Sequence, residues 1–123
     1  MFKLFSLEEA NRLIPVVDTI VSTMQADVKD TLRLRQELSQ LPAHSIESRN
    51  RLHELQFLLQ TIQDSKLELD RLGVFIQDVD TGLIDFPSQL GAEVVCLSWE
   101  KGQDRIQHYH RLNEDTRLPI SSS

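Results

Sequence analysis

The chain has 123 residues, of which 13 are Lys or Arg and 19 are Asp or Glu, so its formal net charge is −6. This balance argues against nucleic-acid binding, because neutralising phosphates requires clustered positive charge. No apolar run approaches the ~20 residues that a membrane helix needs, so we expect no membrane partner. Cys96 is the single cysteine, which excludes an intramolecular disulfide and favours a reducing compartment. We therefore expect a cytoplasmic protein.

Length and composition predict one domain, residues 1–123, with two parts of different character. A helical part is expected over residues 6–72, which contain no glycine, and a β part over residues 73–120, which contain all four glycines. The last three residues, 121–123, are serines and are expected to form a disordered tail.

The first predicted helix begins with a capping box. In this motif Ser6 and Glu9 each accept, through the side chain, a hydrogen bond from the other residue's backbone amide. An apolar stripe with steps of three and four residues follows and predicts one helical face. Pro15 interrupts the stripe, because proline has no amide proton and its ring opposes the carbonyl four residues earlier. We therefore predict a short helix that kinks or breaks near Ile14, and then a long helix from Pro15 to about Leu41.

A second helix follows after a short turn. Ser45 or Ser48 caps it, and it runs to about Leu72 before Gly73. Two long helices joined by a short turn make an antiparallel hairpin. Each helix is about 40 Å long, whereas the strands that follow span roughly 13–23 Å. The strands can cover only part of the hairpin, and we expect a homodimer formed through residues 15–72.

The β part contains short apolar segments separated by glycine-containing turns. Asp80-Thr81-Gly82 and residues 100–104 each place a glycine where a hairpin needs a left-handed residue. The expected strands are Val74–Val79, Leu83–Phe86, Glu93–Trp99 and Arg105–His110. The predicted fold class is α+β: a short capped helix plus a long antiparallel helical hairpin, packed on a small, three- to four-stranded antiparallel β-meander.

Acidic residues near the first turn suggest two kinds of chemistry. Asp80-Thr81-Gly82 matches the aspartic-protease triplet, but a helical first part does not suit an all-β protease, and a hairpin turn is the simpler interpretation. An EF-hand loop beginning at Asp78 would need Gly and Glu where Leu83 and Gln89 stand, so we reject an EF-hand. An incidental cation among the carboxylates stays open.

His108 and His110 have the strongest metal-like spacing, because residues two apart on a strand share a face. A third ligand would come from Asp78 or Asp85 on a neighbouring strand. The alternative is that both histidines are partly exposed and bind no metal. His110 would then form a hydrogen bond that stabilises the fold.

Cys96 lies in an apolar strand segment, so an inert buried thiol is expected rather than a nucleophile. Trp99 and Tyr109 either close one end of the core or line a binding surface. We expect no cofactor.

Several segments together carry a family resemblance: Phe5–Pro15, Leu72–Val74, Asp78, Gly82–Pro87, Leu97–Trp99, Gly102, Tyr109-His110, Arg117 and Pro119. They resemble the family catalogued as domain of unknown function 2203. The resemblance implies a cytoplasmic α+β protein with no assigned activity. The sequence departs from the family pattern at residues 113–115, where a Gly-Phe pair is usual.

The resemblance also ranks the candidate residues. A candidate binding surface consists of polar and aromatic residues on motif positions: Glu9, Asn11, Asp85, Trp99, His110 and Arg117. His108 is not on a motif position, which weakens the two-histidine metal site.

We predict a non-enzymatic protein-interaction or regulatory module that self-associates through its helical hairpin. The alternative is a small metal-binding or hydrolase-like protein that uses His110 with Asp85. His110 would then act as an acid or base, because the ordinary pKa of histidine lies near neutrality. This alternative requires a carboxylate within hydrogen-bond reach of His110.

Overall fold

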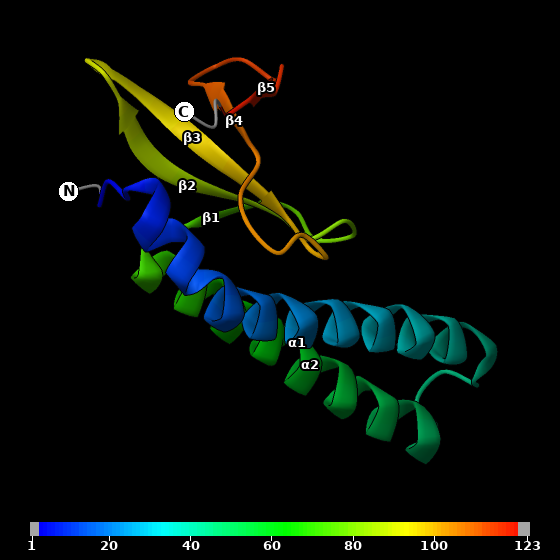
Figure 1. Cartoon of the computed structure of the whole chain (residues 1–123). Coiled ribbons are helices and arrows are strands. Elements are labelled where there is room, and N and C mark those ends of the chain that lie inside the picture. Colours follow the sequence, from blue (N-terminus) through cyan, green and yellow to red (C-terminus); the bar gives the residue numbers. More distant parts are fainter. Residues whose placement is uncertain (1–2, 121–123) are drawn as a thin grey trace.

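The computed structural model of the chain describes residues 3–120, so the predicted tail at 121–123 lies outside the described residues. Two long helices form an antiparallel hairpin, and an antiparallel sheet lies on one side of it (Figure 1). The helices are α1 (Leu7–Gln40) and α2 (Ile46–Leu72). The strands are β1 (Phe75–Asp78), β2 (Leu83–Leu90), β3 (Glu93–Glu100), β4 (His108–Arg111) and β5 (Leu118–Pro119). The predicted α+β class is confirmed.

Helix α1 is continuous from Leu7 to Gln40, so the predicted break near Ile14 is wrong. The capping box is confirmed: the Glu9 amide donates to the Ser6 hydroxyl (3.1 Å) and the Ser6 amide donates to the Glu9 carboxylate (3.0 Å). These bonds satisfy two of the amides that the first helical turn leaves without a partner.

Pro15 lies inside α1 with its ring on the exposed side. The buried residues on both sides of it are Ala10, Ile14, Val17 and Val21. An interior proline costs about 3 kcal/mol, whereas each buried aliphatic side chain contributes roughly 1.5–3 kcal/mol. Burial of the stripe therefore outweighs the lost backbone hydrogen bond, and the helix continues through the proline.

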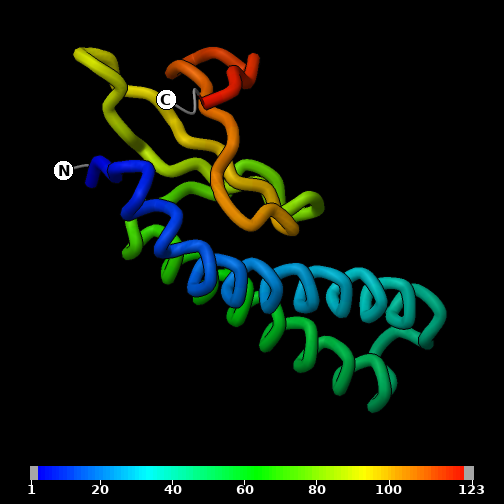
Figure 2. Tube along the Cα trace, viewed as in Figure 1, coloured from blue at the N-terminus to red at the C-terminus, as the bar shows by residue number. Residues whose placement is uncertain are grey.

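Helix α2 begins and ends where the sequence predicts. The Ser45 hydroxyl accepts from the Ser48 amide (3.1 Å) at its start. Gly73 ends the helix in the left-handed conformation, with a φ of 87°. The two helices run side by side along their length (Figure 2). Neither helix in residues 3–120 has an apolar stretch long enough to cross a membrane.

The sheet covers only the half of the hairpin that contains the start of α1 and the end of α2 (Figure 1). The core lies between this half and the inner face of the sheet, where Phe5 packs edge-on against Phe86 at 5.5 Å between ring centroids. Within the described chain, none of residues 26–60 belongs to this core cluster. We call residues 26–60 the distal half of the hairpin.

The sheet has five strands in the order β1-β2-β3-β4-β5, all antiparallel, which is one strand more than the predicted maximum. The additional strand, β5, consists of Leu118 and Pro119 and pairs with the start of β4. Strand β4 begins at His108 rather than at Arg105.

Strand β2 continues to Leu90, although the sequence predicts its end at Phe86. Pro87 does not stop it, because the Pro87 carbonyl accepts from the Phe5 amide (2.7 Å) on the side away from β3. The amide nitrogen of a strand residue points to the same side as its carbonyl, so the missing N–H removes no β2–β3 hydrogen bond.

Alternation along the strands gives the sheet two different faces. Ile84, Phe86, Leu97 and Trp99 are buried toward the helices. The residues between them point to the opposite side, which we call the outer face: Asp85, Cys96, Ser98, His108 and His110. Register pairs Asp85 with Ser98, Ser98 with His108, and Cys96 with His110.

We predict that Pro15→Ala stabilises the protein. The substitution restores the amide that donates to the Asn11 carbonyl and removes the ring clash, so the free energy of unfolding should rise by about 2 kcal/mol. Urea unfolding followed by circular dichroism measures the change. Lys29→Ala, at an exposed position of the same helix, is the matched control and should change stability by less than about 0.5 kcal/mol. A loss of stability in Pro15→Ala would contradict this account.

Candidate functional site

A histidine–carboxylate pair lies on the outer face of the sheet. His110 Nε2 on β4 lies 2.9 Å from Asp85 Oδ2 on β2, so the pair reaches across the intervening strand β3. The Ser98 hydroxyl on β3 donates to Asp85 Oδ1 at 3.2 Å. Asp85 is 1% exposed, and the His110 side chain is 18% exposed. Both oxygens of the buried carboxylate therefore have a hydrogen-bond donor, as a buried charge requires.

Local sequence explains why a carboxylate is buried here. Asp85 lies between Ile84 and Phe86, whose burial in the core fixes which face each β2 residue occupies. Asp85 must then point to the outer face, and the β2–β3 register places it directly opposite Ser98.

His110 is oriented by bonds at both ring nitrogens. Its Nδ1 lies 3.0 Å from the Arg111 carbonyl oxygen, which can only accept, so Nδ1 carries a proton. Its Nε2 faces the Asp85 carboxylate. Burial lowers the pKa of His110, but the bond to the Arg111 carbonyl and the bond and charge of Asp85 raise it, and the pKa lies above its ordinary value of 6.5. The arrangement favours an imidazolium–carboxylate pair.

A pocket of about 260 Å³ opens over this pair. Its lining brings together three of the six sequence candidates, Asp85, His110 and Arg117. The other lining residues are Gln77, Leu83, Ser98 and Asp115. Arg117 Nη1 also lies 3.9 Å from Glu100 Oε1, which holds the guanidinium near the pocket. The pocket therefore presents both signs of charge.

The structure places the other three candidates elsewhere. Glu9 is in the capping box of α1. Asn11 Oδ1 accepts from the Ile106 amide (2.8 Å) and so ties α1 to the segment before β4. Trp99 is buried in the core, and its Nε1 donates to the Gln103 carbonyl at 2.9 Å. These contacts position helices, strands and turns.

The low-ranked metal candidates are also separated. Asp78 Oδ1 accepts from the Asp80 amide (2.9 Å) within the β1–β2 turn. His108 lies on the outer face opposite Ser98 and Pro119, two register pairs away from His110. In residues 3–120 the cluster of possible metal donors contains neither of these residues; it consists of Asp85, Cys96 and His110, whose donor atoms all lie within 4.8 Å of one another.

Cys96 and Ser98 are the site residues that sequence reasoning missed. Burial, and then the charge of Asp85, raise the pKa of Cys96 to about 11, so the thiol is protonated and a poor nucleophile at neutral pH. Cys96 could have been identified from its cross-strand pairing with His110, but predicting that pairing requires knowledge of the β3–β4 register.

The order of the hydrogen bonds restricts the chemistry. In a serine hydrolase, histidine lies between serine and aspartate and removes the serine proton. Here Asp85 lies between Ser98 and His110, so the serine hydroxyl donates to the carboxylate and not to the imidazole. Both imidazole nitrogens are also engaged, which leaves no free nitrogen for acid–base catalysis. The order of these bonds therefore differs from that in a serine hydrolase.

The fold and the site define a class: an α+β protein with a helical hairpin against one face of an antiparallel meander and a buried His–Asp pair on the other. The chain belongs to the family described as "Uncharacterized conserved protein (DUF2203)", which it matches over residues 3–117. The predicted family is thereby confirmed. No curated protein and no solved structure matches the chain.

We predict that His110 makes stability depend on pH in a definite direction. Because its pKa is raised in the folded state, the stabilisation is fully present below about pH 6.5 and is lost as the pH rises through the folded pKa. His110→Gln should lower the free energy of unfolding by about 1–3 kcal/mol at about pH 6. The deficit should shrink at about pH 8.5. Urea titrations with a chelator present measure it.

The control for this prediction is His108→Gln, which removes a histidine from the same face of the same strand but leaves the pair intact. It should keep the wild-type pH profile. A deficit in His110→Gln that is equal at both pH values would show that His110 is not charged in the folded protein.

Proposed function

We propose that the chain is a non-enzymatic, cytoplasmic interaction module that self-associates through the distal half of its helical hairpin. The observation that carries this proposal is the apolar surface that the sheet leaves uncovered. Large hydrophobic side chains are exposed along residues 26–60: Leu32, Ile46, Leu52, Phe57 and Leu59. Exposed apolar side chains in this number favour a protein partner.

The spacing along α2 supports a second helical pair as that partner. Leu52, Leu55, Leu59 and Ile62 follow one another in steps of three and four residues. Leu55 and Ile62 are half-buried, whereas Leu52 and Leu59 are 46% and 44% exposed. A helix that packs on one neighbour needs a narrow seam, whereas each helix of a four-helix bundle buries a wider stripe. Two hairpins packed together would cover Leu52 and Leu59.

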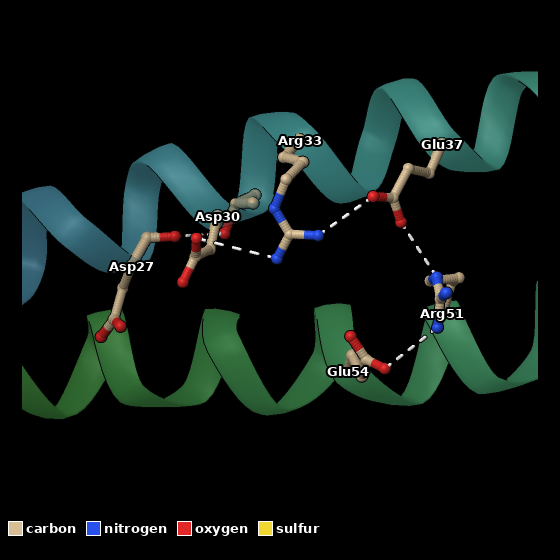
Figure 3. A network of polar contacts seen from close by, with 7 residues as sticks. Asp27, Asp30, Arg33, Glu37, Arg51 and Glu54 are labelled. Carbon is tan, nitrogen blue, oxygen red and sulfur yellow. Dashed lines mark hydrogen bonds and ion pairs between the residues drawn. The ribbon is translucent and has the colours of Figure 1, made fainter.

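The charges of the distal half also fit a second copy. Residues 26–60 contain five Lys or Arg and five Asp or Glu, so this half is neutral although the chain carries −6. Several of these charges pair with one another (Figure 3): Arg51 Nε lies 2.9 Å from Glu37 Oε2 and Arg33 Nη1 lies 3.0 Å from Glu37 Oε1. Exposed ion pairs add little stability, but they remove the net charge that would repel an identical surface.

We predict that charges placed on the α2 stripe prevent self-association. The double substitution Leu52→Glu and Leu59→Glu would bury carboxylates in the proposed interface, so the dissociation constant should rise at least about tenfold. Sedimentation equilibrium at micromolar concentration measures it. Both positions are half-exposed in the single chain, so circular dichroism should show a folded protein.

Leu112→Glu is the matched control, because Leu112 is similarly exposed but lies after β4, outside the hairpin. It should leave self-association unchanged. A wild-type protein that is monomeric throughout the micromolar range would refute the proposal.

A second candidate function is a binding protein that uses the outer face. The observation that favours it is a buried carboxylate, Asp85, bonded to His110 at the floor of a pocket. Burying this charge lowers the stability of the fold, and a binding role would explain why the chain buries a carboxylate here. Ligand binding or metal binding fits better than hydrolysis, because the Ser98 hydroxyl bonds the Asp85 carboxylate and not the imidazole.

A further inference from the structure

Three different metal-ligating groups converge on the outer face from three adjacent strands. Asp85 comes from β2, Cys96 from β3 and His110 from β4, and their donor atoms all lie within 4.8 Å of one another. The register explains the convergence, since Cys96 is directly opposite His110 and Asp85 lies diagonally across β2 and β3. The strands, which are rigid elements, therefore hold the three groups.

We propose that Asp85, Cys96 and His110 form a site for one divalent ion of the zinc class. The inference rests on the second candidate function above and is independent of self-association. A thiolate, an imidazole and a carboxylate form a mixed sulfur, nitrogen and oxygen donor set, which zinc accepts readily. Magnesium and calcium prefer oxygen donors alone and are disfavoured here.

The surroundings already orient two of the ligands. A histidine that binds metal through one ring nitrogen usually donates its other N–H to a carbonyl or carboxylate. His110 has this arrangement: Nδ1 bonds the Arg111 carbonyl, which directs Nε2 into the site. The Ser98 hydroxyl donates to Asp85 Oδ1, which leaves Oδ2 facing Nε2 at 2.9 Å.

The distances require only a small adjustment. Around a tetrahedral ion with bonds of about 2.0–2.3 Å, donor atoms lie about 3.4 Å apart. The Asp85 and His110 donors, now held together by a shared proton, must separate slightly. The most distant pair of donors, within the 4.8 Å limit, must close by at most about 1.4 Å. Rotation of the Cys96 side chain supplies movement of this size.

Charge and protons balance on binding. The ion replaces the Nε2 proton of His110 and the thiol proton of Cys96, so two protons are released. The thiolate and the Asp85 carboxylate then neutralise the two positive charges of the ion, and His110 is neutral. Asp85 and His110 line the pocket, so a fourth position of the ion faces it, as in zinc sites that keep a water molecule.

Cobalt(II) titration tests the site directly, because cobalt(II) binds in zinc sites and a thiolate–cobalt bond absorbs in the near ultraviolet. The full chain without a histidine tag is treated with chelator and titrated with cobalt(II). We expect a thiolate-to-cobalt band that saturates at one ion per chain and that zinc abolishes. Calorimetry at about pH 6.5 in buffers of different ionisation enthalpy should report the release of two protons.

Four variants separate this site from adventitious binding. Cys96→Ser should lose the thiolate band, and His110→Ala should lose saturable binding. Ser98→Ala should weaken binding roughly 10- to 100-fold, because it removes only the bond that orients Asp85. His108→Ala, on the same strand face, should bind as the wild type does.

Circular dichroism confirms that each variant is folded. A folded wild-type protein that gives no thiolate band would overturn the proposal. Saturable cobalt binding that survives in Cys96→Ser and is lost in His110→Ala would overturn the role of Cys96 but leave the His110–Asp85 binding function standing.

Discussion

The buried carboxylate of Asp85 is the constraint on which the outer face depends. Removing an ionised carboxylate from water costs several kcal/mol unless donors surround it, and Asp85 is held on β2 by core residues on either side. Its donors are Ser98 on β3 and His110 on β4. The carboxylate is therefore satisfied only when all three strands are paired in this register, and the same register brings Cys96 beside it.

The two halves of the molecule have different physical characters. The distal half of the hairpin is neutral and leaves large aliphatic side chains exposed. The β part, residues 73–120, has a net charge of −4, and the sheet contains the pocket with Asp85, His110 and Arg117. The sheet lies over the other half of the hairpin (Figure 1). Two copies can therefore associate through the distal halves without covering the pocket, and the two proposed functions are compatible.

Features set by neighbouring residues, such as helix caps, could be predicted from the sequence, whereas the pairing register of the strands could not. Ser6, Ser45 and Gly73 act within one helical turn, so the caps follow from local residue types. The predicted break near Ile14 is wrong because tertiary burial of the α1 stripe outweighs the local effect of Pro15. The predicted end of the strand at Phe86 is wrong because the effect of Pro87 depends on which side of the strand its nitrogen faces. The Cys96–His110 pairing needs the β3–β4 register, which hydrophobic alternation alone does not set.

The central claim is that His110 is held as an imidazolium by Asp85, and nitrogen NMR of the ring tests it most directly. The measurement uses labelled protein with chelator present, at about pH 6.5, where free histidine is half protonated. We predict that His110 is mostly doubly protonated, with N–H protons on both Nδ1 and Nε2, and that His110→Gln removes these signals. A neutral ring with a bare Nε2 at this pH would contradict the account.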